Sequence, residues 1–395
     1  MKISNKIIVL ALRTLAITIT SCKVDDEGSG SSVTSKPTTY DVTVEPFSPG
    51  AYNGQTTRIS LLTALKDIMQ PTTITAITDD AIKEGIEFGS DGTDATTNLY
   101  EKIDENVTGA KGTESYAVAD AFIAMADSLE KISISYDVDA ADGTEGQLSL
   151  TTDKGRFVTS TGVELAQVIE KGLYGAIFYD QMVDDYLASA RVADQVANDI
   201  SDATYDTQGT QRQHDWDEAF GYLGAASDYP STTGSFIAKY MNNVSADLAQ
   251  TTMDAFINGR YELVLGEADG ADNSDNDVIE TAAATIEESL EKAFVGAAFG
   301  YLNASINDLD LGTDAGREAA IHHISEAFGF LYSLTFVESN ITATEVYAVL
   351  EELGWSTDDL TGAYEANLWT ITKEDIEDAI DLLDDNFSDL ATVTF

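Results

Sequence analysis

QRQHDWDEAFGYLGAA, residues 211–226, and AIHHISEAFGFLYSL, residues 320–334, decide the fold, because both stretches contain the same pattern. Aligned on their shared EAFG, each stretch has a histidine four residues before its glutamate. The matched pairs are His214 with Glu218 and His322 with Glu326. All three histidines of the chain lie in these two stretches. Residues four apart are neighbours on a helix, so each stretch predicts a helix with a paired histidine and glutamate.

The two stretches have matching faces when they are drawn as helices at about 100° per residue. His214, Glu218 and Gly221 share one face, and Trp216 and Phe220 lie on the opposite one. A surface helix would carry charges where these stretches carry small residues. We therefore expect both helices to be buried on most sides, and their glutamates to need partners.

A second repeated motif precedes each histidine stretch. The spacing EK-x3-GA-x-F occurs at residues 170–178 and again at 291–299. The first pair of motifs is 121 residues apart and the second pair 108, so the connection is shorter in the second copy. This order predicts an internal duplication of at least two helices per repeat. Short strands or loops are predicted near the N-terminal third.

The predicted organisation follows the repeats. Its segments are a signal peptide at 1–21, a disordered tether at 22–38, N-terminal helices with a loop and strand region at 39–160, a first repeat at 161–230, a connecting helical region at 231–274, and a second repeat with C-terminal helices at 275–395. Helices are predicted at Arg58–Met69, Val118–Ile132, Thr232–Leu265, Thr342–Leu353 and Thr372–Asn386, and a solvated acidic loop at Glu267–Asp277.

Helix starts are predicted from capping patterns. Thr56 or Thr57 is expected to cap the first helix, and Thr161-x-x-Glu164 is expected to open the long helix of the first repeat. Thr210-x-x-Gln213 implies a helix start just before His214, where the helix dipole favours the uncharged imidazole.

The N-terminus resembles a bacterial lipoprotein signal. Residues 1–21 combine a basic start with apolar runs, and Ile19-Thr20-Ser21 precede Cys22, the single cysteine. In that resemblance, Cys22 receives a lipid and the preceding peptide is removed. The acidic residues after Cys22 resemble export tags that send lipoproteins to the outer face of the outer membrane. A buried N-terminal strand with a free thiol is the alternative.

Composition limits the partners. Removing residues 1–21 takes away three of the 21 basic residues and none of the 69 acidic ones, which leaves a net charge of −51. Such a charge excludes nucleic acid and anionic lipid surfaces as partners. One cysteine allows no internal disulfide, so an apolar core drawn from the 43% hydrophobic residues must hold the fold.

Two interpretations of the His-x3-Glu motifs stay open. Imidazole and carboxylate one turn apart can hold a metal ion, and two such helices related by an approximate twofold axis would bring His214, Glu218, His322 and Glu326 together. The pairs can instead satisfy only each other. Asp217, His323 and Arg58 are additional candidates for the site; Arg58 could bind a carboxylate or form a buried ion pair. Signatures of zinc proteases and phosphate-binding loops do not occur in the sequence.

Several blocks together carry a family resemblance. The chain resembles an uncharacterised family of bacterial lipoproteins that is related to the imelysins, which are iron-regulated proteins similar to insulin-cleaving peptidases. The blocks that carry the resemblance are YNGQTTRISLLTAL, VELAQVIEKGLYGAIFY, QHDWDEAFGYLG and HHISEAFGFLYSL. The resemblance covers about residue 52 to the C-terminus. It implies an all-α fold of two pseudo-symmetric helical bundles, arising from the internal duplication, with a pocket between them, and a role near iron or haem uptake at the cell envelope.

The imelysin pattern, Gly-x-His-x-x-Glu, fits this chain in part. His323-x-x-Glu326 matches its second half, with Ile321 at the glycine position. In the first copy, His214-x-x-Asp217 has Asp in place of Glu and Arg212 in place of Gly. These departures separate the chain from the imelysin site itself.

The predicted function is that of a lipid-anchored binding protein of the cell envelope, accessory to uptake, with iron, another divalent metal or haem as its ligand. The expected location is the outer membrane, on its periplasmic or external face, with an outer-membrane receptor as a partner. A metal-dependent peptidase or hydrolase of imelysin type is one alternative. A non-catalytic structural or adhesive surface lipoprotein is the other.

Overall fold

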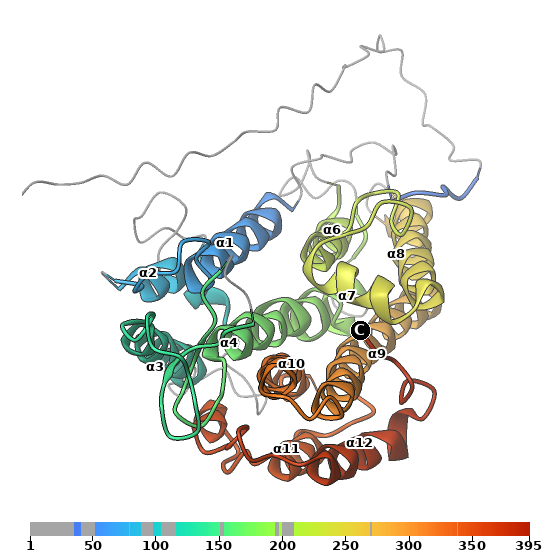
Figure 1. The fold of residues 1–395 in the computed structure, drawn as a ribbon. Coiled ribbons are helices and arrows are strands. Elements are labelled where there is room, and N and C mark those ends of the chain that lie inside the picture. Colours follow the sequence, from blue (N-terminus) through green and yellow to red (C-terminus); the bar gives the residue numbers. More distant parts are fainter. Residues whose placement is uncertain are drawn as a thin grey trace, which may run out of the picture. The chain divides into compact units, whose positions relative to one another are not determined.

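The protein is largely helical (Figure 1). The computed structural model describes residues 35–40, 52–78, 80–87, 98–103, 116–150, 154–193, 197–199, 209–268, 271–337 and 339–395. The predicted all-α class is confirmed. The signal peptide, Cys22 and most of the tether lie outside the described residues.

The N-terminal elements are three helices followed by a small sheet. They are α1 (Asn53–Met69), α2 (Ala81–Glu87), the 3-10 turn η1 (Tyr100–Lys102), α3 (Tyr116–Ser133), and strands β1 (Gly146–Gln147) and β2 (Phe157–Val158). The strands pair antiparallel, Gly146 opposite Val158, within the region where loops and short strands are expected. The expected threonine cap of α1 is wrong. The helix begins earlier, and the hydroxyls of Thr56 and Thr57 donate back to the carbonyl of Asn53.

A long buried helix crosses the middle of the fold. It begins as α4 (Leu165–Leu173), continues as the π-helical segments η2 (Tyr174–Tyr179) and η3 (Gln181–Tyr186), and is followed by the short α5 (Ser189–Val192). Every residue of α4 is buried. The predicted cap at Thr161 is wrong, because the N-cap residue is Glu164 and the hydroxyl of Thr161 contacts Thr159 and the carbonyl of Tyr364 instead.

The first histidine helix, α6 (Gln211–Leu223), begins at the predicted capping box. The side chains of Thr210 and Gln213 each bond the other's backbone N–H. Gly224 ends the helix with φ +73°, a left-handed conformation that glycine adopts without strain. Nearly all of α6 is buried, as expected from its small and apolar residues.

The predicted helix at Thr232–Leu265 is two helices. They are α7 (Phe236–Val244) and α8 (Ala246–Gly266), which are separated by Ser245. Ser245 has an extended backbone and is the N-cap of α8, because its hydroxyl accepts a hydrogen bond from the Leu248 backbone N–H. The acidic loop after α8 contains a hairpin of strands β3 (Glu267–Ala268) and β4 (Ala271–Asp272). The loop is thus not simply solvated, because Asp272 pairs with buried Arg212 at 2.7 Å.

The longest helix described is α9 (Asn276–Leu309), and it is followed by the second histidine helix, α10 (Asp314–Ser333). The helix α10 packs against both α9 and α4 (Figure 1). The C-terminal helices α11 (Ala343–Glu352) and α12 (Lys373–Phe387) lie close to their predicted bounds, and the 3-10 helix η5 (Leu360–Tyr364), which was not predicted, lies between them. Thr342 and Thr372 open α11 and α12 with capping boxes.

Residues Ser35–Phe395 form one compact unit around one large apolar core. The two EK motifs lie at α4 and within α9, but the first continues as π-helix whereas the second stays α-helical. The internal duplication and the segment boundaries drawn from it remain predictions. Among the described helices, none has both the length and the apolar composition required to cross a membrane.

Candidate functional site

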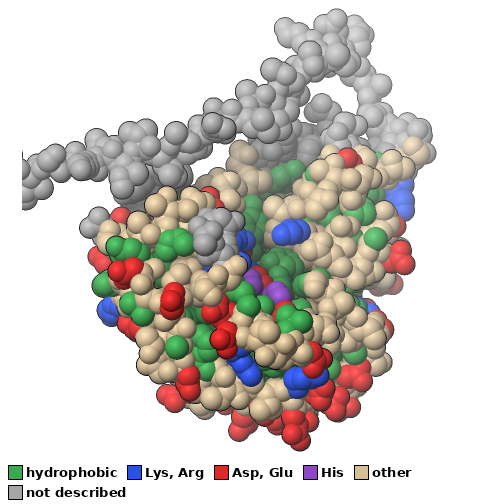
Figure 2. All heavy atoms as spheres, in the orientation of Figure 1, with side chains coloured by type: hydrophobic (Ala, Val, Ile, Leu, Met, Phe, Trp, Pro, Cys, Tyr) green, Lys and Arg blue, Asp and Glu red, His purple; other side chains and the backbone are tan. Residues whose placement is uncertain are grey.

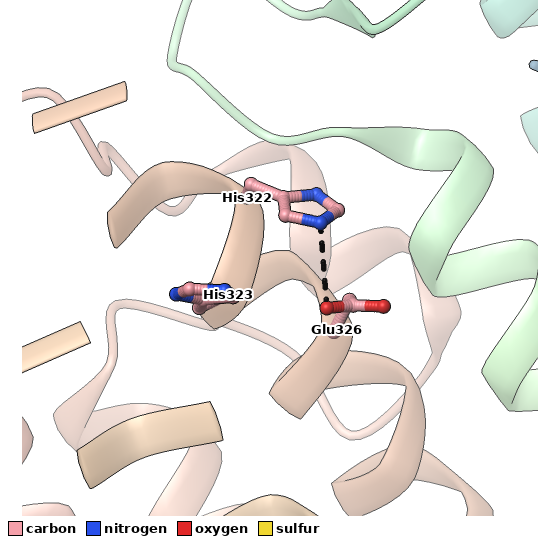
Figure 3. Close-up of side chains that lie close together, drawn as sticks. All are labelled: His322, His323 and Glu326. Atoms are coloured by element: carbon pink, nitrogen blue, oxygen red, sulfur yellow. Dashed lines mark ion pairs between the residues drawn. The ribbon is translucent and has the colours of Figure 1, made fainter. Parts of the chain in front are cut away.

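Two histidines and a glutamate on α10 form the candidate site. His322, His323 and Glu326 each offer a ligand atom, and these atoms lie within 4.8 Å of one another (Figure 3). Within the described part of the chain, they form the one such group of three or more histidine, cysteine or acidic side chains. Histidine side chains lie in a hollow of the face drawn in Figure 2, next to acidic and basic groups. We call these three residues the α10 site.

His322 lies between two carboxylates. Its Nδ1 is 2.7 Å from Oε2 of Glu164, and its Nε2 is 3.4 Å from Oε2 of Glu326. Glu164 is itself positioned by α10, because its backbone N–H donates to the Ser325 hydroxyl at 2.9 Å. If Nδ1 donates its proton to Glu164, the Nε2 lone pair faces an acceptor oxygen. A cation between these two atoms would interact favourably with both.

His323 has a similar arrangement. Its Nδ1 is 2.7 Å from Oδ2 of Asp308, which belongs to the preceding helix α9. A carboxylate that accepts a hydrogen bond from Nδ1–H fixes the ring orientation and the tautomer, so that the Nε2 lone pair can bind a metal ion. His323 has 28% of its side chain exposed and His322 13%, so both rings are accessible from solvent.

Glu326 connects the site to a buried ion-pair network. Its Oε1 lies 3.0 Å from the Lys171 ammonium, which lies 3.0 Å from Glu170; Glu170 in turn lies 2.7 Å from Lys66. The helices α4 and α10 can approach this closely because Gly329 has no side chain. A Cβ at that position would lie 2.5 Å from Cβ of Lys171.

Arg156, just before β2, completes the surroundings of His322. Its Nη1 is 2.6 Å from Nδ1 and 2.9 Å from Nε2 of that ring, and 3.4 and 3.5 Å from the Glu164 oxygens. The two ring nitrogens direct their N–H or lone pair away from each other in the ring plane, so an atom this close to both nitrogens lies over the ring face. Nε of Arg156 is buried without a hydrogen-bond partner among the described residues.

The charges around the site keep its carboxylates ionised. Burial alone would raise the pKa of Glu164, but His322 and Arg156 outweigh it and bring this pKa down to about 2. Burial also opposes ionisation of Glu326, yet Lys171 and His322 lower its pKa. The α10 site therefore presents a carboxylate at neutral pH.

The first His-Glu pair has different partners. Nε2 of His214 is 3.4 Å from Oε2 of Glu218, and Oε1 of Glu218 accepts from the Gln55 amide at 2.8 Å. Burial lowers the pKa of His214 and raises that of Glu218, so both shift toward the neutral forms. Gln55 supplies a neutral amide where the second pair has the Lys171 ammonium, and this difference gives the two glutamates opposite pKa shifts.

The structure does not bring the two pairs into one cluster. His214 and Glu218 lie outside the group of ligand atoms formed by the α10 site, so the expected four-residue site is not formed. The reason is packing: α6 contacts α1, η3 and α8, whereas α10 contacts α9 and α4. Gly221 of α6 lies against Tyr52, the N-cap residue of α1, and Gln55 of α1, where a Cβ at Gly221 would lie within 3.0 Å of both, and this packing gives the first pair its own neighbours.

Two other predicted residues point elsewhere. Asp217 is buried and bonded by Arg260 at 2.9 Å and by the Tyr40 hydroxyl at 2.6 Å, and the Tyr40 ring stacks on Phe220 at 3.7 Å. Arg58 is buried and donates to the Asn98 carbonyl and the Tyr222 hydroxyl, both at 3.2 Å. These contacts hold α1 and α6 in place and lie away from the α10 site. Cys22 lies outside the described residues.

Sequence reasoning missed four residues that shape the site. They are Arg156, Glu164, Lys171 and Asp308. Two of them lie in motifs that the sequence analysis used for other purposes. Glu164 was predicted to be part of a helix cap, and Lys171 to be part of a repeated motif. Only the packing of α4, α9 and α10 gives them their roles.

Comparison with known proteins places the chain in a family. A family model matches residues 37–388, most of the chain, and is described as a domain of unknown function, DUF4856. The chain belongs to this family. Neither the curated proteins nor the solved structures include a match. The relation to imelysin therefore remains a prediction from motifs.

Proposed function

We propose that this protein binds a divalent transition metal ion at the α10 site, as an accessory to metal uptake at the cell envelope. His322 and His323 would supply imidazole nitrogens, and Glu326 a carboxylate oxygen. This donor set suits Zn²⁺ and Fe²⁺, which proteins bind through two histidines and one carboxylate.

The observation that carries the proposal is the pair of carboxylates behind the histidines. Glu164 and Asp308 each lie 2.7 Å from an Nδ1 atom, as second-layer carboxylates do behind metal-binding histidines. Both rings can then offer Nε2. The 3.4 Å between Nε2 of His322 and Oε2 of Glu326 is also suitable, since ligands of a tetrahedral Zn²⁺ lie about 3.3–3.5 Å apart.

The competing interpretation is a purely structural ion-pair network. Without a metal and with His322 neutral, Lys66, Lys171 and Arg156 balance the carboxylates of Glu164, Glu170 and Glu326. Such a network satisfies its members without any ligand. The exposed edge of His323 and the second carboxylate at Asp308 favour metal binding over this alternative.

Metal titration tests the proposal. The purified protein is stripped with a chelator and titrated with Zn²⁺ and Fe²⁺, the latter without oxygen, while binding and melting temperature are measured. We expect binding at one site with a higher melting temperature, and loss of both in His323→Ala and Glu326→Gln. His214→Ala is the matched control on α6 and should bind normally. Wild-type protein that binds neither ion would contradict the proposal.

Two alternatives are tested in the same preparation. Haem is added separately and followed by its visible absorption, because a haem protein would show histidine ligation there. A hydrolase is a second candidate, since three protein ligands leave an open metal position where water can be activated. If the protein is a hydrolase, it should cleave peptides, and both a chelator and the His323→Ala variant should abolish this cleavage.

The cellular location is proposed from the sequence. We infer a lipid on Cys22 and attachment to the outer membrane, where a receptor would be the partner, because small residues precede this cysteine after an apolar run. Labelling cells with a radioactive fatty acid should mark the wild-type protein. Label retained in Cys22→Ser would contradict this assignment.

A further inference from the structure

A metal ion held by the α10 site would have coordination positions that the three side chains do not fill. Three protein donors complete neither a tetrahedral nor a larger coordination shell, so at least one position stays open. The rings of His322 and His323 are partly exposed, which gives a small molecule access to that position. What fills it depends on the charges nearby.

A monoanion would balance the charge that a metal ion adds to the ion-pair network. Lys66, Lys171 and Arg156 give three positive charges, and Glu164, Glu170, Glu326 and Asp308 give four negative ones, so the surroundings sum to −1. A divalent ion changes the sum to +1 in a largely buried place. A bound monoanion restores neutrality, which is the favourable state for buried charge.

Arg156 is positioned to hold that anion. It lies over the His322 ring, and its contacts with Glu164 are long, at 3.4 and 3.5 Å, and not those of a close two-bond pair. Its Nε has no hydrogen-bond partner among the described residues. A guanidinium with donors to spare matches the two oxygens of a planar oxyanion.

We propose that the α10 site binds its metal ion together with a small planar oxyanion, bicarbonate or a carboxylate, which coordinates the metal and is bound by Arg156. This inference rests on the proposed metal binding and adds its second ligand. Metal and anion should then increase each other's affinity, because their binding is linked.

Cobalt titration with and without bicarbonate tests this proposal. Co²⁺ replaces the native ion, and its visible absorption reports the number and kind of ligands. The metal-free full-length protein is titrated in buffer freed of carbon dioxide, and again with bicarbonate. We expect bicarbonate to raise Co²⁺ affinity about tenfold, within the usual range of linked binding, and to change the spectrum.

Variants separate the anion from the metal. In Arg156→Gln we expect Co²⁺ still to bind, but with the same affinity and spectrum in both buffers. Arg191→Gln, which removes an arginine paired with Asp185 and Asp215, is the matched control and should keep the bicarbonate effect. A bicarbonate effect that persists in Arg156→Gln overturns the proposal.

The wild-type protein alone also decides the question if Arg156→Gln does not fold. Equal Co²⁺ affinity and equal spectra in the two buffers overturn the anion proposal while metal binding stands. Absence of Co²⁺ binding in both buffers contradicts the proposed function itself. The two failures are therefore distinguishable.

Discussion

Replacing Lys171 by methionine should strongly destabilise the protein. The side chain is 1% exposed and lies 3.0 Å from both Glu170 and Glu326. Glu170 keeps Lys66 and the Tyr174 hydroxyl, each at 2.7 Å. Glu326 loses its only ion pair with a lysine or arginine among the described residues. Removing one partner of a buried pair typically costs about 3–5 kcal/mol, and we expect a loss in that range.

Urea denaturation at neutral pH measures this change through the shift of the unfolding midpoint. The double variant Lys171→Met with Glu326→Gln removes the unpaired carboxylate, and should recover at least about half of the loss. The single variant should also approach wild type as the pH falls, because Glu326 becomes protonated. A loss below about 1 kcal/mol, or no recovery in the double variant, would refute the reasoning.

Two further predictions concern acid and packing. The folded-state pKa values of Glu164 and Glu170 are both about 2, below the usual value, so their stabilisation is present above pH 4.5 and is lost as the pH falls toward 2. Acid titration followed by circular dichroism should show unfolding in that interval, and Glu164→Gln should flatten the curve; an unchanged slope would contradict the assignment. Gly221→Ala places a Cβ 2.6 Å from Cβ of Tyr52 and should cost about 1–3 kcal/mol. Gly54→Ala places a Cβ 3.2 Å from Nη1 of Arg58 and should cost less than Gly221→Ala, because a side-chain end must move by only a few tenths of an ångström; equal melting of the two alanine variants would refute the packing argument.

Local signals were predictable from the sequence. The capping box at Thr210 and Gln213 acts within four residues and was predicted from the pattern. The helices at Thr342 and Thr372 were predicted to begin where they do, although their capping boxes were not part of that prediction. The buried character of α6 and α10 likewise follows from the glycine, alanine and serine on their polar faces. The positions and the buried character of these helices could therefore be predicted from composition and spacing.

Tertiary contacts were not predictable in the same way. Thr161-x-x-Glu164 fits a capping box, yet the Thr161 hydroxyl hydrogen-bonds the Thr159 hydroxyl and the Tyr364 carbonyl instead of capping the helix. Glu164 is 158 residues from His322, and Lys171 is 155 from Glu326, so no local pattern joins them. The four-residue site failed for the same reason, since a shared motif does not determine which helices pack together.

The buried ring of Tyr40 has a mechanical consequence. Lys36 contacts Asn258 through an exposed hydrogen bond, whereas Tyr40 is held by its stacking on Phe220 and its bond to Asp217. Tension applied at residue 35 would first break the exposed contact and then load the Tyr40 ring. The force would therefore reach the folded body at α6, the helix of the first His-Glu pair, and not at α10. A protein held by its N-terminal end would bear its load on α6, while the side chains of α10 keep their arrangement.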